Sequence, residues 1–114
     1  MFNKNDKSIF DIINNYNWDD GFDYPASLLL DNPCDLALAL CIFYLADGYR
    51  FLQAVPEQKD RNSQWVAFID SLYRNIIDGS YVKTKRPYRI PLTKVQLYHL
   101  QKLEVPEVFL KDLP

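Results

Sequence analysis

Apolar residues recur with a helical period in three stretches of the chain. The first holds Ile9, Ile12, Ile13 and Tyr16, spaced as on one face of a helix. The second, residues 63–78, is the clearest and places seven apolar residues on one broad face: Trp65, Phe68, Ile69, Leu72, Tyr73, Ile76 and Ile77. The third follows Thr93, a suitable N-cap, and contains Val95, Leu97, Leu100 and Leu103. Each stretch predicts an amphipathic helix packed against a core.

Residues 36–46 are apolar without interruption. A helix that is apolar on every side is normally buried, so we expect a central helix at about residues 35–46 with the others packed around it. Asn32 is suited to cap this helix, with Pro33 at its first position and Asp35 in its first turn. Gly48 is the expected C-terminal stop.

The remaining segments are shorter. Pro25–Leu30 predicts a short helix that begins with proline, residues 49–55 a helical turn, and residues 56–62 a polar loop. Pro87 and Pro91 exclude a helix from residues 80–91, where we expect a short irregular or hairpin excursion. The C-terminal tail should dock through Val108, Phe109 and Leu113. The fold predicted is all-α, a compact bundle of five or six helices forming one domain over residues 1–114.

Charge is unevenly divided along the chain. The net charge of −2 argues against a protein built mainly to bind nucleic acid. Residues 1–60 contain ten acidic and four basic residues (−6), whereas residues 61–114 contain five and nine (+4). Such asymmetry fits either a partner selected by charge or two faces that attract each other within the fold.

The cysteines and the hydropathy pattern indicate the compartment. Cys34 and Cys41 are seven residues apart on one predicted helix, a rise of about 10 Å, which is too long for a disulfide. We expect reduced thiols, as in cytosolic proteins. There is no CxxC pair, so we expect no metal site, and no cofactor motif is present. The N-terminus lacks a signal-peptide pattern. The longest apolar run, residues 36–46, falls short of the roughly 20 residues of a membrane span, so we expect a soluble, cytoplasmic protein.

His99 is the only histidine, so a nucleophile–histidine–acid system would have to use it. The sequence lacks the GxSxG and HExxH motifs, and three glycines are too few for a glycine-rich phosphate loop. A catalytic site is therefore not expected, and an enzyme that pairs His99 with a carboxylate is the least favoured of the functions considered.

Two clusters of charge are candidates for binding. Asp19, Asp20 and Asp23 form an acidic cluster that fits either a partner-binding loop or a turn whose carboxylates satisfy backbone N–H groups. Trp18 and Phe22 flank it and should fasten the loop to the core. The second cluster mixes cations with tyrosines, a pattern suited to phosphate contacts and base stacking; it comprises Lys83, Lys85, Arg86, Tyr88 and Arg89.

Residues 17–48 resemble a family of small uncharacterised bacterial proteins. The shared motifs are a W-[DN]-D-G-[FW] turn, here Trp18 to Phe22, and a C-D-L-[AG] helix, here Cys34-Asp35-Leu36-Ala37, which continues to the F-[WY]-L-[AS]-D segment ending at Asp47. Residues 90–103 are similar more loosely. Proteins of this kind are found among candidate immunity proteins of bacterial toxin systems, including contact-dependent inhibition.

The resemblance implies a protein that binds and neutralises a cognate toxin domain and that has no active site of its own. Immunity proteins often face basic nucleases through charge and aromatic anchors. We expect occlusion of basic toxin residues by Asp19, Asp20 and Asp23 with the neighbouring Tyr24 and Tyr49. The alternative is a nucleic-acid or regulatory binding module that uses residues 83–89.

Overall fold

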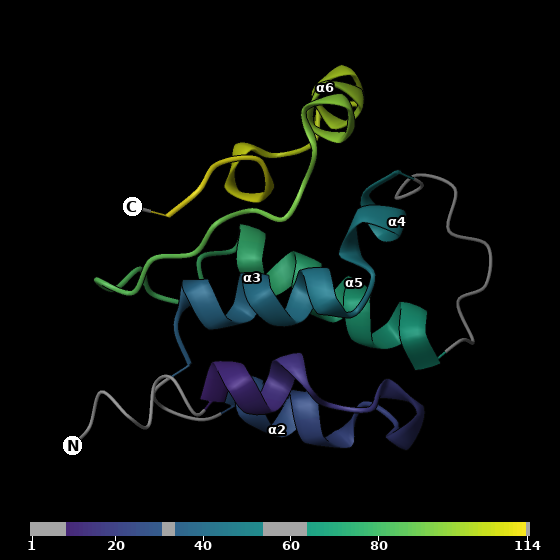
Figure 1. Cartoon of the computed structure of the whole chain (residues 1–114), viewed down its shortest axis with the longest axis vertical. Helices are drawn as coiled ribbons and strands as arrows, with labels where there is room; N and C mark the ends of the chain where they lie inside the picture. Colours follow the sequence, from purple (N-terminus) through teal and green to yellow (C-terminus); the bar gives the residue numbers. More distant parts are fainter. Residues whose placement is uncertain (1–8, 31–33, 54–63, 114) are drawn as a thin grey trace.

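Helix α3 (Leu36–Leu45) lies at the centre of the computed structural model (Figure 1). The structure describes residues 9–30, 34–53 and 64–113. Within these ranges the chain is all-α and contains no strand, as the sequence predicts. Residues 9–14 are helical, and the later elements are η1 (Trp18–Asp20), α2 (Asp23–Leu30), α3, α4 (Gly48–Gln53), α5 (Gln64–Ile77), α6 (Lys94–Lys102) and η3 (Glu107–Phe109).

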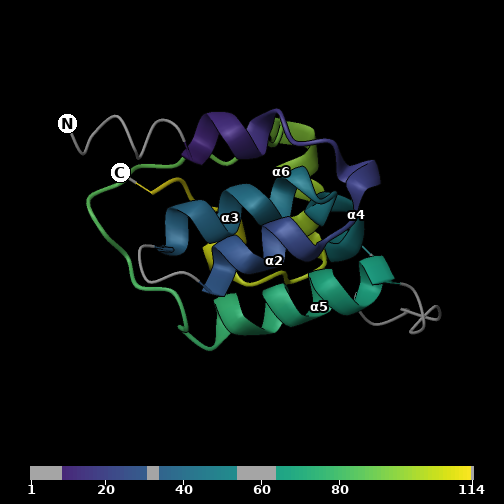
Figure 2. The same cartoon turned by 90° about the horizontal axis from the view of Figure 1, so that it is seen from below.

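The central position of α3 follows from its composition. Seven of its ten residues are buried, Ala37 to Phe43, so it presents apolar side chains to neighbours on every side. Helices α2, α4 and α5 contact it directly. Figure 2 shows α5 and residues 9–14 on opposite sides of it. A helix that is apolar all round is stable in water only when it is covered in this way.

The ends of α3 differ from the sequence-based expectation. Asp35, not Asn32, is the N-cap, and its carboxylate accepts a hydrogen bond from the Leu38 N–H (2.9 Å); Asn32 and Pro33 lie outside the described residues. Gly48 does not terminate α3 but begins α4, after Asp47 at φ 70°. A Cβ at Gly48 would lie 2.3 Å from the Phe43 ring. Close packing against Phe43 is therefore what requires glycine here.

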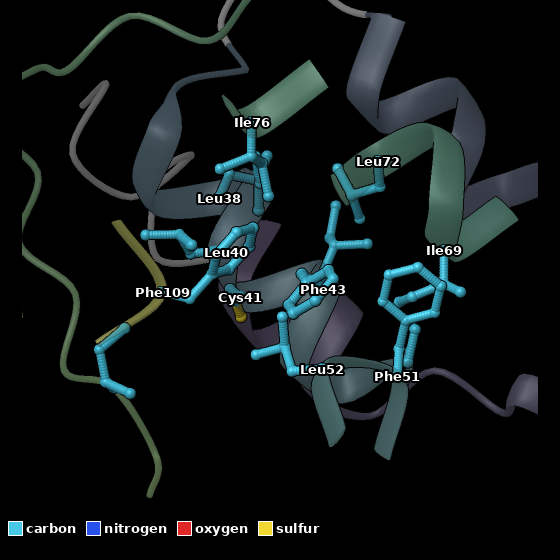
Figure 3. Packing of buried hydrophobic residues seen from close by; sticks show 14 of the residues in the cluster. Leu38, Leu40, Cys41, Phe43, Phe51, Leu52, Ile69, Leu72, Ile76 and Phe109 are labelled. Carbon is cyan, nitrogen blue, oxygen red and sulfur yellow. The ribbon is translucent and has the colours of Figure 1, made fainter. Parts of the chain in front are cut away.

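The core is rich in aromatic rings (Figure 3). Phe43 and Phe51 are fully buried beside Ile69 and Leu72 of α5. Phe109 of η3 enters this core, with its ring 4.9 Å from that of Phe43 and stacked on Tyr73 at 5.3 Å. The predicted docking of the tail is confirmed, and the fully buried residue at its centre is Phe109.

Helix α6 is less well covered than its pattern predicts. Thr93 caps it as expected and forms a capping box with Gln96. Only Leu100 is buried, however, while Val95 and Leu103 are 77% and 46% exposed. The reason is position, because α6 lies at the edge of the molecule (Figure 1), where only one side of the helix meets the core.

Residues 80–91 form the predicted irregular excursion. No hairpin closes within it. Tyr88 instead pairs with Leu113 of the tail in an isolated antiparallel bridge, and the Ile90 N–H donates to the Asp112 carboxylate (2.8 Å). The excursion is thus held by the tail. No described helix combines the length and apolar character that crossing a membrane requires, and the predicted loop 56–62 lies outside the described residues.

Candidate functional site

The acidic turn, defined here as residues 17–24, owes its shape to two residues. The Asn17 side chain caps η1 by accepting a hydrogen bond from the Asp19 N–H (3.1 Å). Gly21, at φ 99°, adopts a conformation that favours glycine, and its N–H donates to the Trp18 carbonyl (3.2 Å). The local sequence therefore closes the turn without help from the carboxylates of Asp20 and Asp23.

Aromatic side chains fix this turn to the helices beneath it. The Trp18 ring lies edge-on to Tyr16 at 5.3 Å and to Phe68 of α5 at 6.3 Å. Phe22 stacks on the same Phe68 at 5.0 Å. The Tyr16 hydroxyl donates to the Gly21 carbonyl (2.7 Å). Trp18 and Phe22 do fasten the loop to the core, as the sequence predicts.

The three carboxylates of the turn take no part in this aromatic support. Asp19, Asp20 and Asp23 are exposed, and none of them forms an ion pair with another described residue. Desolvation raises the pKa of Tyr16, and the charges of Asp20 and Asp23 raise it further. These two carboxylates therefore lie near the Tyr16 hydroxyl. Tyr24 is 39% exposed, with its ring 5.5 Å from that of Tyr16.

Tyr49 does not belong to this surface. It is half-buried on α4 and lines a groove of about 520 Å³ formed by other parts of the chain. Four of the five residues expected to face the partner are thus brought together, and the fifth lies elsewhere. Within the described part of the chain, no three His, Cys, Asp or Glu residues lie close enough together to hold a metal ion.

The basic segment, defined here as residues 83–89, divides into inward and outward residues. Arg86 turns inward, with its Nε atom 3.2 Å from the Asp35 carboxylate, and both side chains are largely buried, at 14% and 3% exposure. Its guanidinium also lies over the Phe10 ring, 5.2 Å from the centroid. Tyr88 is half-buried, whereas Lys83, Lys85 and Arg89 are exposed.

Asp35 organises this end of the fold, a role that the sequence analysis missed. One carboxylate oxygen caps α3, and the other accepts from the Thr84 hydroxyl (2.6 Å) and faces Arg86. The Leu36 N–H donates to the Val82 carbonyl (2.9 Å). The available signal was a lone Asp directly before an uncharged helix. Such a buried charge requires a cation, but its partner, fifty-one positions away, carries no local signal.

His99 is exposed on α6 and forms no ion pair or side-chain hydrogen bond with another described residue. Cys34 and Cys41 are both buried, and no disulfide joins them to each other.

A family model for a domain of unknown function, DUF4274, matches residues 4–77, well over half of the chain. The chain belongs to this family. The match confirms the resemblance to an uncharacterised domain family, and its description carries no activity. It includes the acidic turn and α2 to α5, and it ends before the basic segment, α6 and the tail. No curated protein and no solved structure matches the chain.

Proposed function

We propose that this protein is a bacterial immunity protein that binds a cognate toxin domain in the cytoplasm and neutralises it by covering its basic residues. The observation that supports this most is the acidic turn, where three exposed carboxylates have no ion-pair partner among the described residues. Charges left uncompensated within a fold are available to an oppositely charged partner.

The rigid mounting of the turn adds to this support. A loop held by Tyr16, Trp18 and Phe68 loses little conformational freedom on binding, which lowers the entropic cost of association. Tyr24 supplies an exposed aromatic ring beside the carboxylates, and tyrosine is enriched among residues that dominate binding energy. The carboxylates themselves would chiefly accelerate association and make it sensitive to salt.

The mechanism is occlusion and uses no chemistry of its own. A stable interface of standard size buries about 800 Å² on each partner. The acidic turn has only eight residues, fewer than the roughly 20–30 that each partner of such an interface contributes, so it would form the charged part of a larger contact surface. A basic nuclease domain is the class of toxin whose substrate-binding residues such a surface would cover.

The experiment is affinity capture. The tagged protein is incubated with lysate of its own host, and proteins retained in a stoichiometric ratio are identified. We expect one small toxin-like domain, bound with a Kd of about 10 nM or tighter, which corresponds to about −11 kcal/mol. The double variant Asp19→Lys plus Asp20→Lys should lose it, whereas the matched reversal Lys83→Glu plus Lys85→Glu should retain it. Retention by the Asp variant would place the contact surface elsewhere, and capture of no protein would contradict the proposal.

A further inference from the structure

The groove that Tyr49 lines has no role in the proposed function. It has a volume of about 520 Å³, within the range typical of small-molecule sites. Its walls come from residues 9–14, the end of α3, the start of α4 and residues 88–96. The groove is therefore lined both by the part of the chain that matches the family model and by the segment beyond residue 77.

Three tyrosine rings line this groove, Tyr44, Tyr49 and Tyr88. The Tyr44 hydroxyl donates to the Phe109 carbonyl. The Tyr88 hydroxyl and the Cys41 thiol form no side-chain hydrogen bond with another described residue, although Cys41 is 3% exposed. Flat aromatic walls of this kind suit an aromatic ring, which packs against others by offset or edge-to-face stacking.

The hydroxyl groups of Tyr44 and Tyr88 and the thiol of Cys41 are uncharged near neutral pH. Burial raises the pKa of Tyr44 and of Tyr88, and it raises the pKa of the Cys41 thiol to about 11. The neighbouring Cys41 and Tyr44 raise the pKa of Tyr88 further, which places these three groups close together. They therefore add no negative charge to the groove.

Two opposite charges also line the groove, Arg89 and Asp47. Both are exposed, and neither forms an ion pair with the other or with another described residue. A guanidinium matches the fork of a carboxylate, and a carboxylate matches an ammonium group. Both side chains line the same groove without pairing with each other, so each is available to a ligand group of opposite charge.

We propose that this groove binds a small aromatic zwitterion of the amino-acid class, with its ring among Tyr44, Tyr49 and Tyr88, its carboxylate on Arg89 and its ammonium group on Asp47. The site is distinct from the acidic turn and does not depend on toxin binding. For a ligand of about a dozen heavy atoms, the expected Kd is roughly 0.1–1 mM.

The test is an NMR titration of the isotope-labelled full chain with L-phenylalanine. Two analogues of the same skeleton serve as matched probes, 3-phenylpropionate without the ammonium group and phenethylamine without the carboxylate. We expect saturable shifts confined to residues that line the groove, and at least fivefold weaker binding of each analogue. Absence of saturation at about ten times the expected Kd, shifts centred elsewhere, or equal binding of either analogue would overturn the proposal.

Three variants complete the test. Arg89→Gln and Asp47→Asn should each weaken binding of L-phenylalanine at least fivefold, and asparagine is suited to the positive φ at position 47. Lys85→Gln removes an exposed cation of the same segment that does not line the groove, and it should change nothing. The double variant Asp19→Lys plus Asp20→Lys should also bind normally, which separates this site from the acidic turn. Wild-type affinity in Arg89→Gln would contradict the assignment.

Discussion

The acidic turn and the basic segment look alike in sequence, since each interleaves several like charges with aromatic residues, but the fold uses them differently. In the acidic turn the Trp18 and Phe22 rings pack onto the core, and all three carboxylates remain exposed. In the basic segment Arg86 is drawn inward to Asp35, and Tyr88 is half-buried and bridged to the tail. Only the first surface keeps its full set of charges for a partner.

The difference comes from what lies beneath each segment. The acidic turn packs on apolar rings, which form no ion pair with its carboxylates. The basic segment, in contrast, covers a buried carboxylate at the start of α3. A buried charge must be paired, so the Asp35 carboxylate forms an ion pair with Arg86 of the basic segment. A cluster of charges in a sequence therefore keeps all of its charges exposed only where no buried group beneath it pairs with one of them.

Breaking the buried pair of Asp35 and Arg86 should have the largest effect on stability. Arg86→Ala leaves the Asp35 carboxylate buried without its cation, which typically costs about 3–5 kcal/mol of unfolding free energy. Asp35→Ala should cost as much or more, because it also removes the N-cap of α3. Urea unfolding measures both variants. Lys85→Ala, an exposed neighbour, should change the unfolding free energy by less than about 0.5 kcal/mol. Equal effects of Arg86→Ala and Lys85→Ala would remove the distinction between inward and outward cations.

Trp18→Ala tests the mounting of the acidic turn. Trp18 is half-buried between Tyr16, Phe22 and Phe68, so its loss should cost about 2–4 kcal/mol. Thermal unfolding followed by circular dichroism gives the effect on stability. Partner affinity should fall as well, since the carboxylates would lose their fixed positions. A stable Trp18→Ala protein with wild-type affinity would show that the turn needs no aromatic support.

The stability of the protein at alkaline pH tests whether the Cys41 thiol is buried. Burial raises the pKa of the Cys41 thiol from its ordinary value of 9.0 to about 11 in the fold, so the unfolded chain loses this proton first. The contribution of the protonated thiol to the unfolding free energy is complete below pH 9, and it is lost as the pH rises through about 11. This amounts to about 2–3 kcal/mol from Cys41, with further losses from Tyr44 and Tyr88. Unfolding free energies at pH 8 and pH 10.5 should differ less in Cys41→Ala than in the wild type. An identical pH dependence in the two proteins would place this thiol in water.

The smallest effect is expected for nucleic acid. With Arg86 engaged by Asp35 and Tyr88 half-buried, Lys83, Lys85 and Arg89 remain exposed, too few for strong phosphate binding. The immobilised protein should retain neither single-stranded nor double-stranded oligonucleotides at low salt. Retention that Lys83→Glu plus Lys85→Glu abolishes would restore the nucleic-acid hypothesis. Arg86 is best left unchanged in this test, because its substitution alters the fold.

The sequence predicted those parts of the fold that local pattern determines. The buried α3, the amphipathic α5 and the Thr93 cap follow from periodicity and short-range hydrogen bonding, and the docking of Phe109 follows from an apolar tail. The pairing of Asp35 with Arg86 could not be predicted, because the residues are far apart in sequence and each resembles an ordinary surface charge. The exposed side of α6 and the close approach at Gly48 likewise depend on which elements meet in space.

Of the candidate sites, the acidic turn was found because its carboxylates are adjacent in sequence. The groove was missed because its lining comes from four separate segments. Tyr49 was assigned to the turn although no local pattern connects it to residues 17–24, and the structure places it in the groove instead.

The most direct test is the triple variant Asp19→Asn, Asp20→Asn, Asp23→Asn, with stability and partner capture measured on the same protein. Asparagine preserves size and turn-forming ability while it removes the charges. If the carboxylates serve a partner and not the fold, the unfolding midpoint will be unchanged or slightly higher, and the toxin domain retained by the wild type will be lost. A lowered midpoint with capture intact would show instead that the charges of the acidic turn belong to the fold.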